Sequence, residues 1–216
     1  MKHLTVYGDS IAAGYGARPG RGFVPDLARI LAVRTRTRAP YLNFGVPGMT
    51  SYALASALVY NDAWCEGLIG CNSVCVLIGG DDLIDNLPRL LSRNRRGIAQ
   101  TAKASALAYG AVLARIRART RAPLAVGTLY NPYPATALAE EAIAAYNEAV
   151  IIPVARAAGA SIAPIHEAFA GRQAALIDGF STGVAGQPGR CGIAFPIHPN
   201  AQGHAVIAET FAPLVR

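Results

Sequence analysis

The chain has 216 residues, of which 52% are hydrophobic and 15% are charged, and its formal net charge is +7. This composition excludes disorder for most of the chain and predicts one globular domain over residues 1–216. No apolar run reaches the roughly 18 residues of a membrane helix and no signal peptide opens the chain, so we expect a cytoplasmic protein without a membrane span.

Strand-like and helix-like stretches alternate along the chain. In chain order, the expected elements are a strand at 3–7, helix 23–33, strand 41–44, helix 52–61, strand 73–78, helix 97–119, strand 124–129, helix 136–158, strand 161–165 and helix 200–214. Pro153 is expected to kink or interrupt its helix. The alternation predicts an α/β fold, a three-layer α/β/α sandwich around a flavodoxin-like parallel sheet of five strands.

The positive charge comes mainly from arginines in three short groups. No aromatic residues interleave these groups as stacking platforms for bases, so we expect no nucleic acid as partner. The first and third groups lie where helices are expected to end, where cations interact favourably with the helix dipole. The groups are Arg34, Arg36 and Arg38; Arg89, Arg93, Arg95 and Arg96; and Arg115, Arg117, Arg119 and Arg121.

Ligands of such sheets bind beyond the carboxyl ends of the strands, which directs attention to the loops there. The first strand leads into GDSIAAGYG, where Ser10 lies at a strand-to-helix turn with its hydroxyl exposed. The alternative interpretation is that Ser10 only caps a helix. The second and third strands are followed by the glycine-rich loops NFGVPGMTS and IGGDDL.

A histidine near the C-terminus is the natural partner for this serine. His198 lies in PIHPNAQGH, just before the helix start expected at Asn200, from where it could reach a serine at the edge of the sheet. The other histidines, His3, His166 and His204, are interpreted as structural or surface residues.

The cysteines do not indicate a metal. Their spacing matches no common zinc motif, and four are too few for a disulfide scaffold in a chain of this length, so structural thiols and no metal are expected. They are Cys65, Cys71, Cys75 and Cys191.

Taken in order, these motifs resemble those of the SGNH, or GDSL, hydrolase superfamily across nearly the whole chain. Gly8-Asp9-Ser10 matches the block that carries the nucleophilic serine, and Gly48 in NFGVPGMTS matches the glycine of the second block. The third block, G-x-N-D, aligns with residues 79–82, and the last, D-x-x-H, aligns with residues 195–198.

The resemblance implies hydrolysis of a small or medium carboxylic ester without a cofactor. Ser10 would be the nucleophile and His198 the base, and backbone N–H groups of Ser10 and Gly48 would stabilise the oxyanion, with position 81 as its third contributor. Asp82 matches the aspartate of the third block, with an expected structural role, and Asp9 is expected to support the turn at Ser10. The oligomeric state is left open.

Two positions depart from the family pattern. Asp81 replaces the asparagine that donates to the oxyanion, and an ionised carboxylate can only accept hydrogen bonds. Phe195 replaces the aspartate three residues before the histidine. Asp178, Glu167 or a main-chain carbonyl near Phe195 could orient His198 instead. The departures leave a second interpretation, a catalytically weakened relative that binds an ester or a protein partner.

Overall fold

Five parallel strands form the centre of the molecule in the order β2-β1-β3-β4-β5. The computed structural model describes residues 2–86 and 95–216. The strands are β1 (Leu4–Gly8), β2 (Tyr41–Gly45), β3 (Ser73–Leu77), β4 (Leu124–Gly127) and β5 (Ser161–Ala163). This arrangement confirms the predicted flavodoxin-like α/β fold. The strand order reverses between β1 and β3, so the loops after these two strands border the crevice where such sheets bind ligands.

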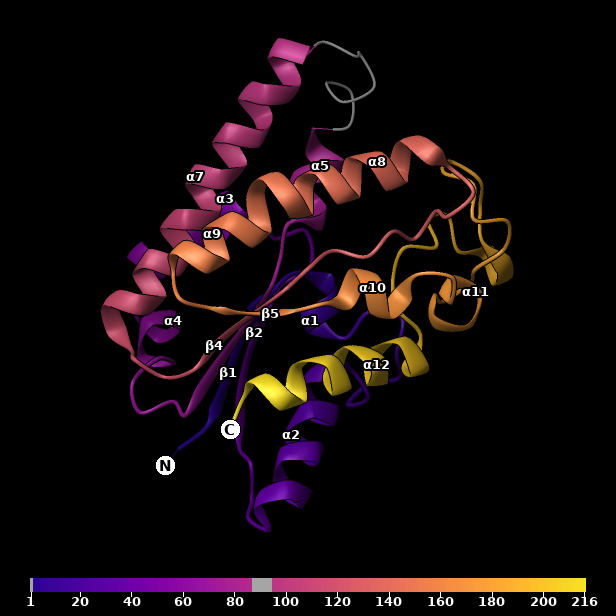
Figure 1. Cartoon of the computed structure of the whole chain (residues 1–216). Helices are drawn as coiled ribbons and strands as arrows, with labels where there is room; N and C mark the ends of the chain where they lie inside the picture. The colour runs from indigo at the N-terminus through magenta and orange to yellow at the C-terminus, as the bar shows by residue number, and fades with distance from the viewer. Residues whose placement is uncertain (1, 87–94) are drawn as a thin grey trace.

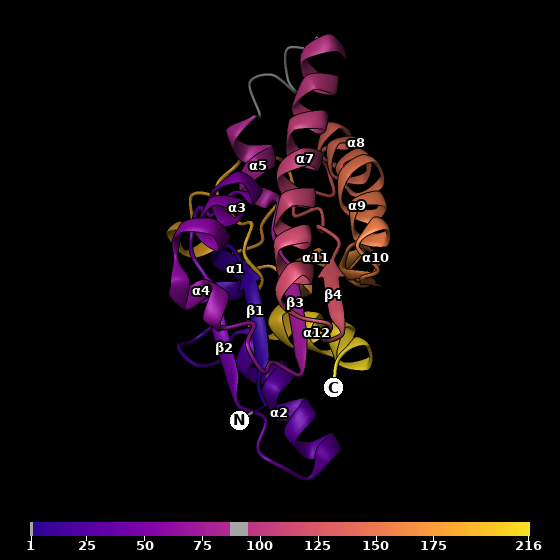
Figure 2. The same ribbon diagram turned by 90° about the vertical axis from the view of Figure 1, so that its left-hand side faces the viewer.

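Helices cover both faces of the sheet (Figure 1). One face carries α1 (Ser10–Ala13), α2 (Phe23–Thr35), α10 (Ile165–Phe169), α11 (Gln173–Leu176) and α12 (Ala201–Phe211), and the other carries α3 (Ser51–Tyr60), α4 (Asp62–Glu66), α7 (Arg95–Arg119) and α9 (Ile152–Ala157). The remaining helices are α5 (Gly80–Asp85), α8 (Ala137–Tyr146), the π-helical turn η1 (Asn147–Ile151) and the 3-10 turns η2 (Arg190–Gly192) and η3 (Ala212–Leu214). Figure 2 shows α7 running past the end of the sheet.

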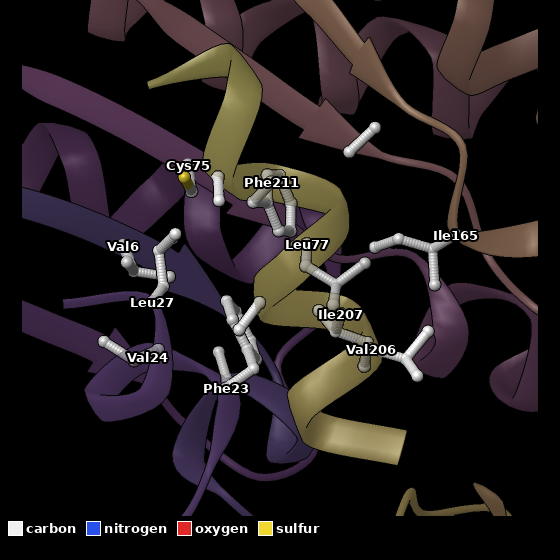
Figure 3. Packing of buried hydrophobic residues seen from close by; sticks show 14 of the residues in the cluster. Val6, Phe23, Val24, Leu27, Cys75, Leu77, Ile165, Val206, Ile207 and Phe211 are labelled. Atoms are coloured by element: carbon white, nitrogen blue, oxygen red, sulfur yellow. The ribbon is translucent and has the colours of Figure 1, made fainter. Parts of the chain in front are cut away.

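The alternation of side chains along each strand divides the core into two clusters. On β1, Val6 faces the cluster under α2 and α12, where Phe23, Ile207 and Phe211 pack (Figure 3). Its neighbour Tyr7 faces the opposite cluster, under α3 and α7. Because both faces of the sheet are buried, the central strands consist of nearly continuous apolar residues. This pattern is why their positions could be predicted from the sequence.

The helix expected over residues 136–158 is continuous from Ala137 to Ala157, without a break at Pro153, but its hydrogen-bond pattern changes in the middle. A π-helical turn separates α8 from α9, and Pro153 lies in the first turn of α9. Inside the π turn the Asn147 side chain accepts a hydrogen bond from the Leu129 N–H and donates one to the Leu129 carbonyl, both at 2.8 Å. The Asn147 side chain therefore provides hydrogen-bond partners for the backbone N–H and carbonyl of Leu129, just beyond β4. The short helices α4, α5, α10 and α11 were not predicted, because fewer than two turns give no readable period.

The arginines described by the structure support the helix-end interpretation. Arg117, in the last turn of α7, donates to the carbonyls of Ala158 and Gly159 after α9, at 2.9 and 2.8 Å. Arg34, in the last turn of α2, donates to the Ala212 carbonyl at the end of α12, at 2.6 Å. These guanidinium groups thus satisfy orphan carbonyls at helix ends. The expectations for Arg89 and Arg93 lie outside the described residues.

Within residues 2–86 and 95–216, none of the helices combines the length and the apolar character that crossing a membrane requires.

Candidate active site

Ser10 stands at the carboxyl end of β1, as the first residue of α1. The N-cap of this helix is Asp9, whose carboxylate accepts the Ile11 N–H at 2.9 Å. The interpretation of Ser10 as a mere helix cap is therefore wrong, because Asp9 does the capping. The Ser10 N–H lies at a helix N-terminus, where backbone N–H groups have no partner within the helix and favour negative charge.

His198 lies next to Ser10, although 188 residues separate them along the chain. Its Nε2 is 3.0 Å from the Ser10 Oγ, within hydrogen-bond distance. The Asn200 side chain caps α12 by accepting the N–H groups of Gln202 and Gly203, which fixes the start of this helix just beyond His198. The structure thus brings together the serine and the histidine that the sequence selected.

The loop after α1 packs against His198, a contact that sequence reasoning missed. The Tyr15 ring lies with its centroid 5.3 Å from that of the imidazole. Gly16 has φ +84°, and a Cβ there would lie 2.2 Å from the Pro199 carbonyl oxygen and 3.1 Å from the Cβ of His198. Only glycine permits this approach. The two glycines of GYG were the signal in the sequence that could have indicated this close approach.

The backbone before α12 is held from two other directions. Ile177 and Pro199 form an antiparallel bridge, and the Asp178 N–H donates to the His198 carbonyl at 2.8 Å. The buried Tyr130 hydroxyl donates to the Ile197 carbonyl at 2.5 Å. His198 is therefore carried on a segment whose main chain is fixed on both sides.

Gly48 and Asp82 lie in the loops after β2 and β3. Gly48 is exposed and has φ +76°, with no atom near the position of an added Cβ, so its conformation favours glycine and its surroundings are open. The buried Asp82 carboxylate accepts the Ser51 N–H at 2.8 Å and the Ser51 hydroxyl at 2.5 Å. Asp82 thus ties the loop after β3 to the start of α3, the structural role expected from the sequence.

Asp9, next to Ser10 in sequence, and Asp81, in the first turn of α5, both have raised pKa values. Burial, together with repulsion from Asp81 and Asp82, raises the pKa of Asp9 to about 7, although the Ile11 N–H lowers it; the residue is only 2% exposed. Partial burial and the charges of Asp85 and Asp82 raise the pKa of Asp81. A raised pKa favours the protonated form, and a protonated carboxyl can donate a hydrogen bond.

Phe195 is 66% exposed, and its carbonyl accepts the Ile197 N–H at 2.9 Å. Partial burial lowers the pKa of His198, and the charge of Asp178 acts in the opposite direction. Glu167 is exposed on α10. Of the groups considered from the sequence as partners of His198, Asp178 is the one whose charge acts on the imidazole.

His204 is a structural residue, as expected, and it also supports the site. It is completely buried, its Nδ1 accepts the Phe23 N–H at 3.1 Å, and its Nε2 lies 2.8 Å from the Tyr15 carbonyl oxygen. These bonds require the proton on Nε2, and burial lowers the pKa of His204, which favours this neutral form. His204 thereby anchors the loop that places Tyr15 against His198.

The strand order places the protein in the flavodoxin-like α/β class of folds. Comparison with known protein families identifies its family within this class. The model of the GDSL-like lipase/acylhydrolase family matches residues 6–206, so the chain belongs to this family, as its motifs indicated. No curated protein sequence matches the chain.

Solved structures share the fold over the full length of the chain. The lipase Lip_vut3 from a goat rumen metagenome superposes with a TM-score of 0.80 at 20% identity, covering 100% of this chain and 99% of that one. LAE5, an alpha/beta hydrolase from the metagenome of Lake Arreo, gives 0.67 at 21% identity, covering 99% and 94%. Axe2, an acetylxylan esterase from Geobacillus stearothermophilus, gives 0.70 at 15% identity, covering 99% and 93%.

Proposed function

We propose that this chain is a single-domain serine esterase that cleaves a small or medium carboxylic ester at Ser10. The observation that carries the proposal is the 3.0 Å separation of Ser10 Oγ and His198 Nε2 at the carboxyl edge of β1. Membership of the GDSL-like lipase/acylhydrolase family supports the same class of reaction. The structural neighbour Axe2, described as an acetylxylan esterase, was also solved as catalytic mutants with a serine or a histidine replaced by alanine.

The proposed reaction is acyl transfer in two steps. Ser10 Oγ forms a bond to the ester carbonyl carbon while its proton passes to His198 Nε2, and the carbonyl electrons move onto oxygen. When the intermediate collapses, the imidazolium protonates the departing alcohol. Water then releases the acyl group from Ser10 with the same histidine as base. The lowered pKa of His198 keeps the imidazole neutral, and so able to accept a proton, at neutral pH.

In the proposed reaction, three groups stabilise the negative charge on the carbonyl oxygen. The N–H groups of Ser10 and Gly48 are two donors, the first at the N-terminus of α1. Asp81, in the first turn of α5, takes the third position and acts as a donor only when protonated.

The function is tested with p-nitrophenyl esters of increasing acyl length, starting from acetate, together with a fluorophosphonate probe of nucleophilic serines. We expect hydrolysis that declines for long acyl chains, and stoichiometric labelling. A folded protein that binds esters without turnover and resists labelling would support the alternative of a weakened, ester-binding relative. The unusual groups at positions 81 and 195 favour that alternative.

Replacing Asp81 by asparagine is expected to raise kcat/KM on a reactive ester by roughly tenfold, about 1.4 kcal/mol in the transition state. The side chains are nearly isosteric, and the amide supplies an N–H donor where an ionised carboxylate repels the developing negative charge. The gain should be largest above neutral pH and shrink in acid, because the raised pKa of Asp81 provides the protonated donor there. Rate profiles of both proteins on one substrate measure it.

Asp85→Asn is the matched control for Asp81→Asn. Asp85 is exposed on the same helix and contributes to the raised pKa of Asp81, so its replacement removes a nearby charge without adding a donor at position 81. We expect the control to change kcat/KM by about twofold or less. Equal gains in both variants, or a loss in Asp81→Asn with folding intact, would exclude Asp81 as a limiting group of the oxyanion hole.

A further inference from the structure

The backbone pairing next to His198 brings an acidic residue, Asp178, beside it. In the antiparallel pair that contains the bridge between Ile177 and Pro199, the next residues in register are Asp178 and His198. The Asp178 N–H donates to the His198 carbonyl at 2.8 Å, which confirms this register. Asp178 and His198 are therefore adjacent through a backbone hydrogen bond beside a single β-bridge.

The charges around His198 single out Asp178. Among the described groups, the Ser10 hydroxyl lies at hydrogen-bond distance from the imidazole, the Tyr15 ring packs on it, and His204 and the Asp178 carboxylate interact with it electrostatically. Asp178 is the anion among them. Its charge raises the pKa of His198 against the larger lowering effect of burial. It therefore favours the imidazolium form.

The interaction is electrostatic and longer than a hydrogen bond. Within residues 2–86 and 95–216, the carboxylate of Asp178 forms no direct hydrogen bond or ion pair with the His198 ring. An exposed phenylalanine occupies the position three residues before the histidine, so no acid approaches from there. The half-buried Asp178 carboxylate is the available source of compensating charge when the ring becomes protonated.

We propose that Asp178 is the positioning carboxylate of this site: held next to His198 by the hydrogen bond from its own N–H to the His198 carbonyl, it stabilises and orients the imidazole as the ring accepts the proton of Ser10. The inference rests on the proposed function and adds a residue to it that lies outside the D-x-x-H block. Asp178 is brought next to the histidine by backbone pairing between two segments, not by the sequence segment that carries the histidine.

Asp178→Asn tests the proposal selectively, because the backbone N–H that holds His198 is retained while the charge is removed. We expect kcat to fall roughly three- to tenfold with KM little changed, since the carboxylate matters most when the ring is charged. The acid limb of the pH profile should move to lower pH by about half a unit, because the charge that raises the pKa of His198 is gone. Asp178→Glu should restore part of the rate and of the shift.

Glu167→Gln is the matched control, since it removes an exposed carboxylate from α10. It should leave kcat and the acid limb as in the unmodified chain. An NMR titration of His198, assigned by the loss of its signal in His198→Gln, should show the same half-unit decrease in the pKa of His198 in Asp178→Asn and no change in Glu167→Gln.

The NMR titration needs no turnover, so the two proposals fail in different ways. An unmodified chain without hydrolysis or labelling contradicts the proposed function. An active chain in which Asp178→Asn keeps its kcat and its acid limb overturns the role of Asp178 alone. An unmoved His198 titration overturns that role whether or not the chain is active.

Discussion

Replacing Ser10 by alanine is expected to abolish ester hydrolysis and fluorophosphonate labelling together. The hydroxyl 3.0 Å from His198 Nε2 is the group that forms the acyl bond in the proposed reaction, and no other atom of the variant can take its place. Removing the nucleophile of a serine hydrolase costs roughly 10³-fold or more in kcat. Initial rates on p-nitrophenyl acetate and in-gel fluorescence of the labelled protein measure the two losses.

Ser161→Ala provides the control for Ser10→Ala. Ser161 is exposed on β5, outside the site, so its replacement tests whether the loss of any serine hydroxyl affects the assay. We expect this variant to hydrolyse the ester and to be labelled like the unmodified chain. Circular dichroism establishes that both variants fold. Labelling that persists in a folded Ser10→Ala would show that another residue is the nucleophile.

The stability of the folded chain is expected to decrease as the pH rises from about 4 to 7, because of Asp9. Its pKa is about 7 in the folded chain and near 3.8 when unfolded, so between these values the folded state keeps a proton that the unfolded state has released. The free energy of unfolding should fall by about 1.4 kcal/mol per pH unit in this window, on the order of 4 kcal/mol in total, and level off above the folded pKa.

Comparison with Asp9→Asn isolates this effect. His198 and His204 have lowered pKa values, so their contribution has the opposite sign: stability falls as the pH drops below 6.5. The variant keeps both histidines, and its amide oxygen can still accept the Ile11 N–H. We therefore expect the variant to gain stability relative to the unmodified chain as the pH rises, in urea unfolding at several pH values.

Asp62→Asn is the control for Asp9→Asn. It removes one negative charge at an exposed position, at the start of α4. Its unfolding free energies should run parallel to those of the unmodified chain. If the difference between Asp9→Asn and the unmodified chain were the same at every pH, the proton uptake assigned to Asp9 would be wrong.

The sequence identified the site largely through motifs that are local along the chain. Ser10 and Gly48 lie in turns directly after apolar strands, and in a parallel sheet the carboxyl ends of neighbouring strands share one edge. His198 was found from the helix start at Asn200, a capping signal that spans a few residues. Such local signals predict which residues stand at the edge, and the 3.0 Å contact agrees with that prediction.

By itself, then, the sequence determined the α/β fold, the order of its elements, the family and the choice of Ser10 and His198, because each depends on patterns a few residues long. Only the tertiary structure decided that the Asp178 N–H donates to the His198 carbonyl, since this contact depends on pairing between segments 20 residues apart with no shared motif. It also decided that Tyr15 packs on His198 and that burial raises the pKa of Asp9. Ring contacts and desolvation depend on what surrounds a side chain in space, and this is set by distant parts of the chain.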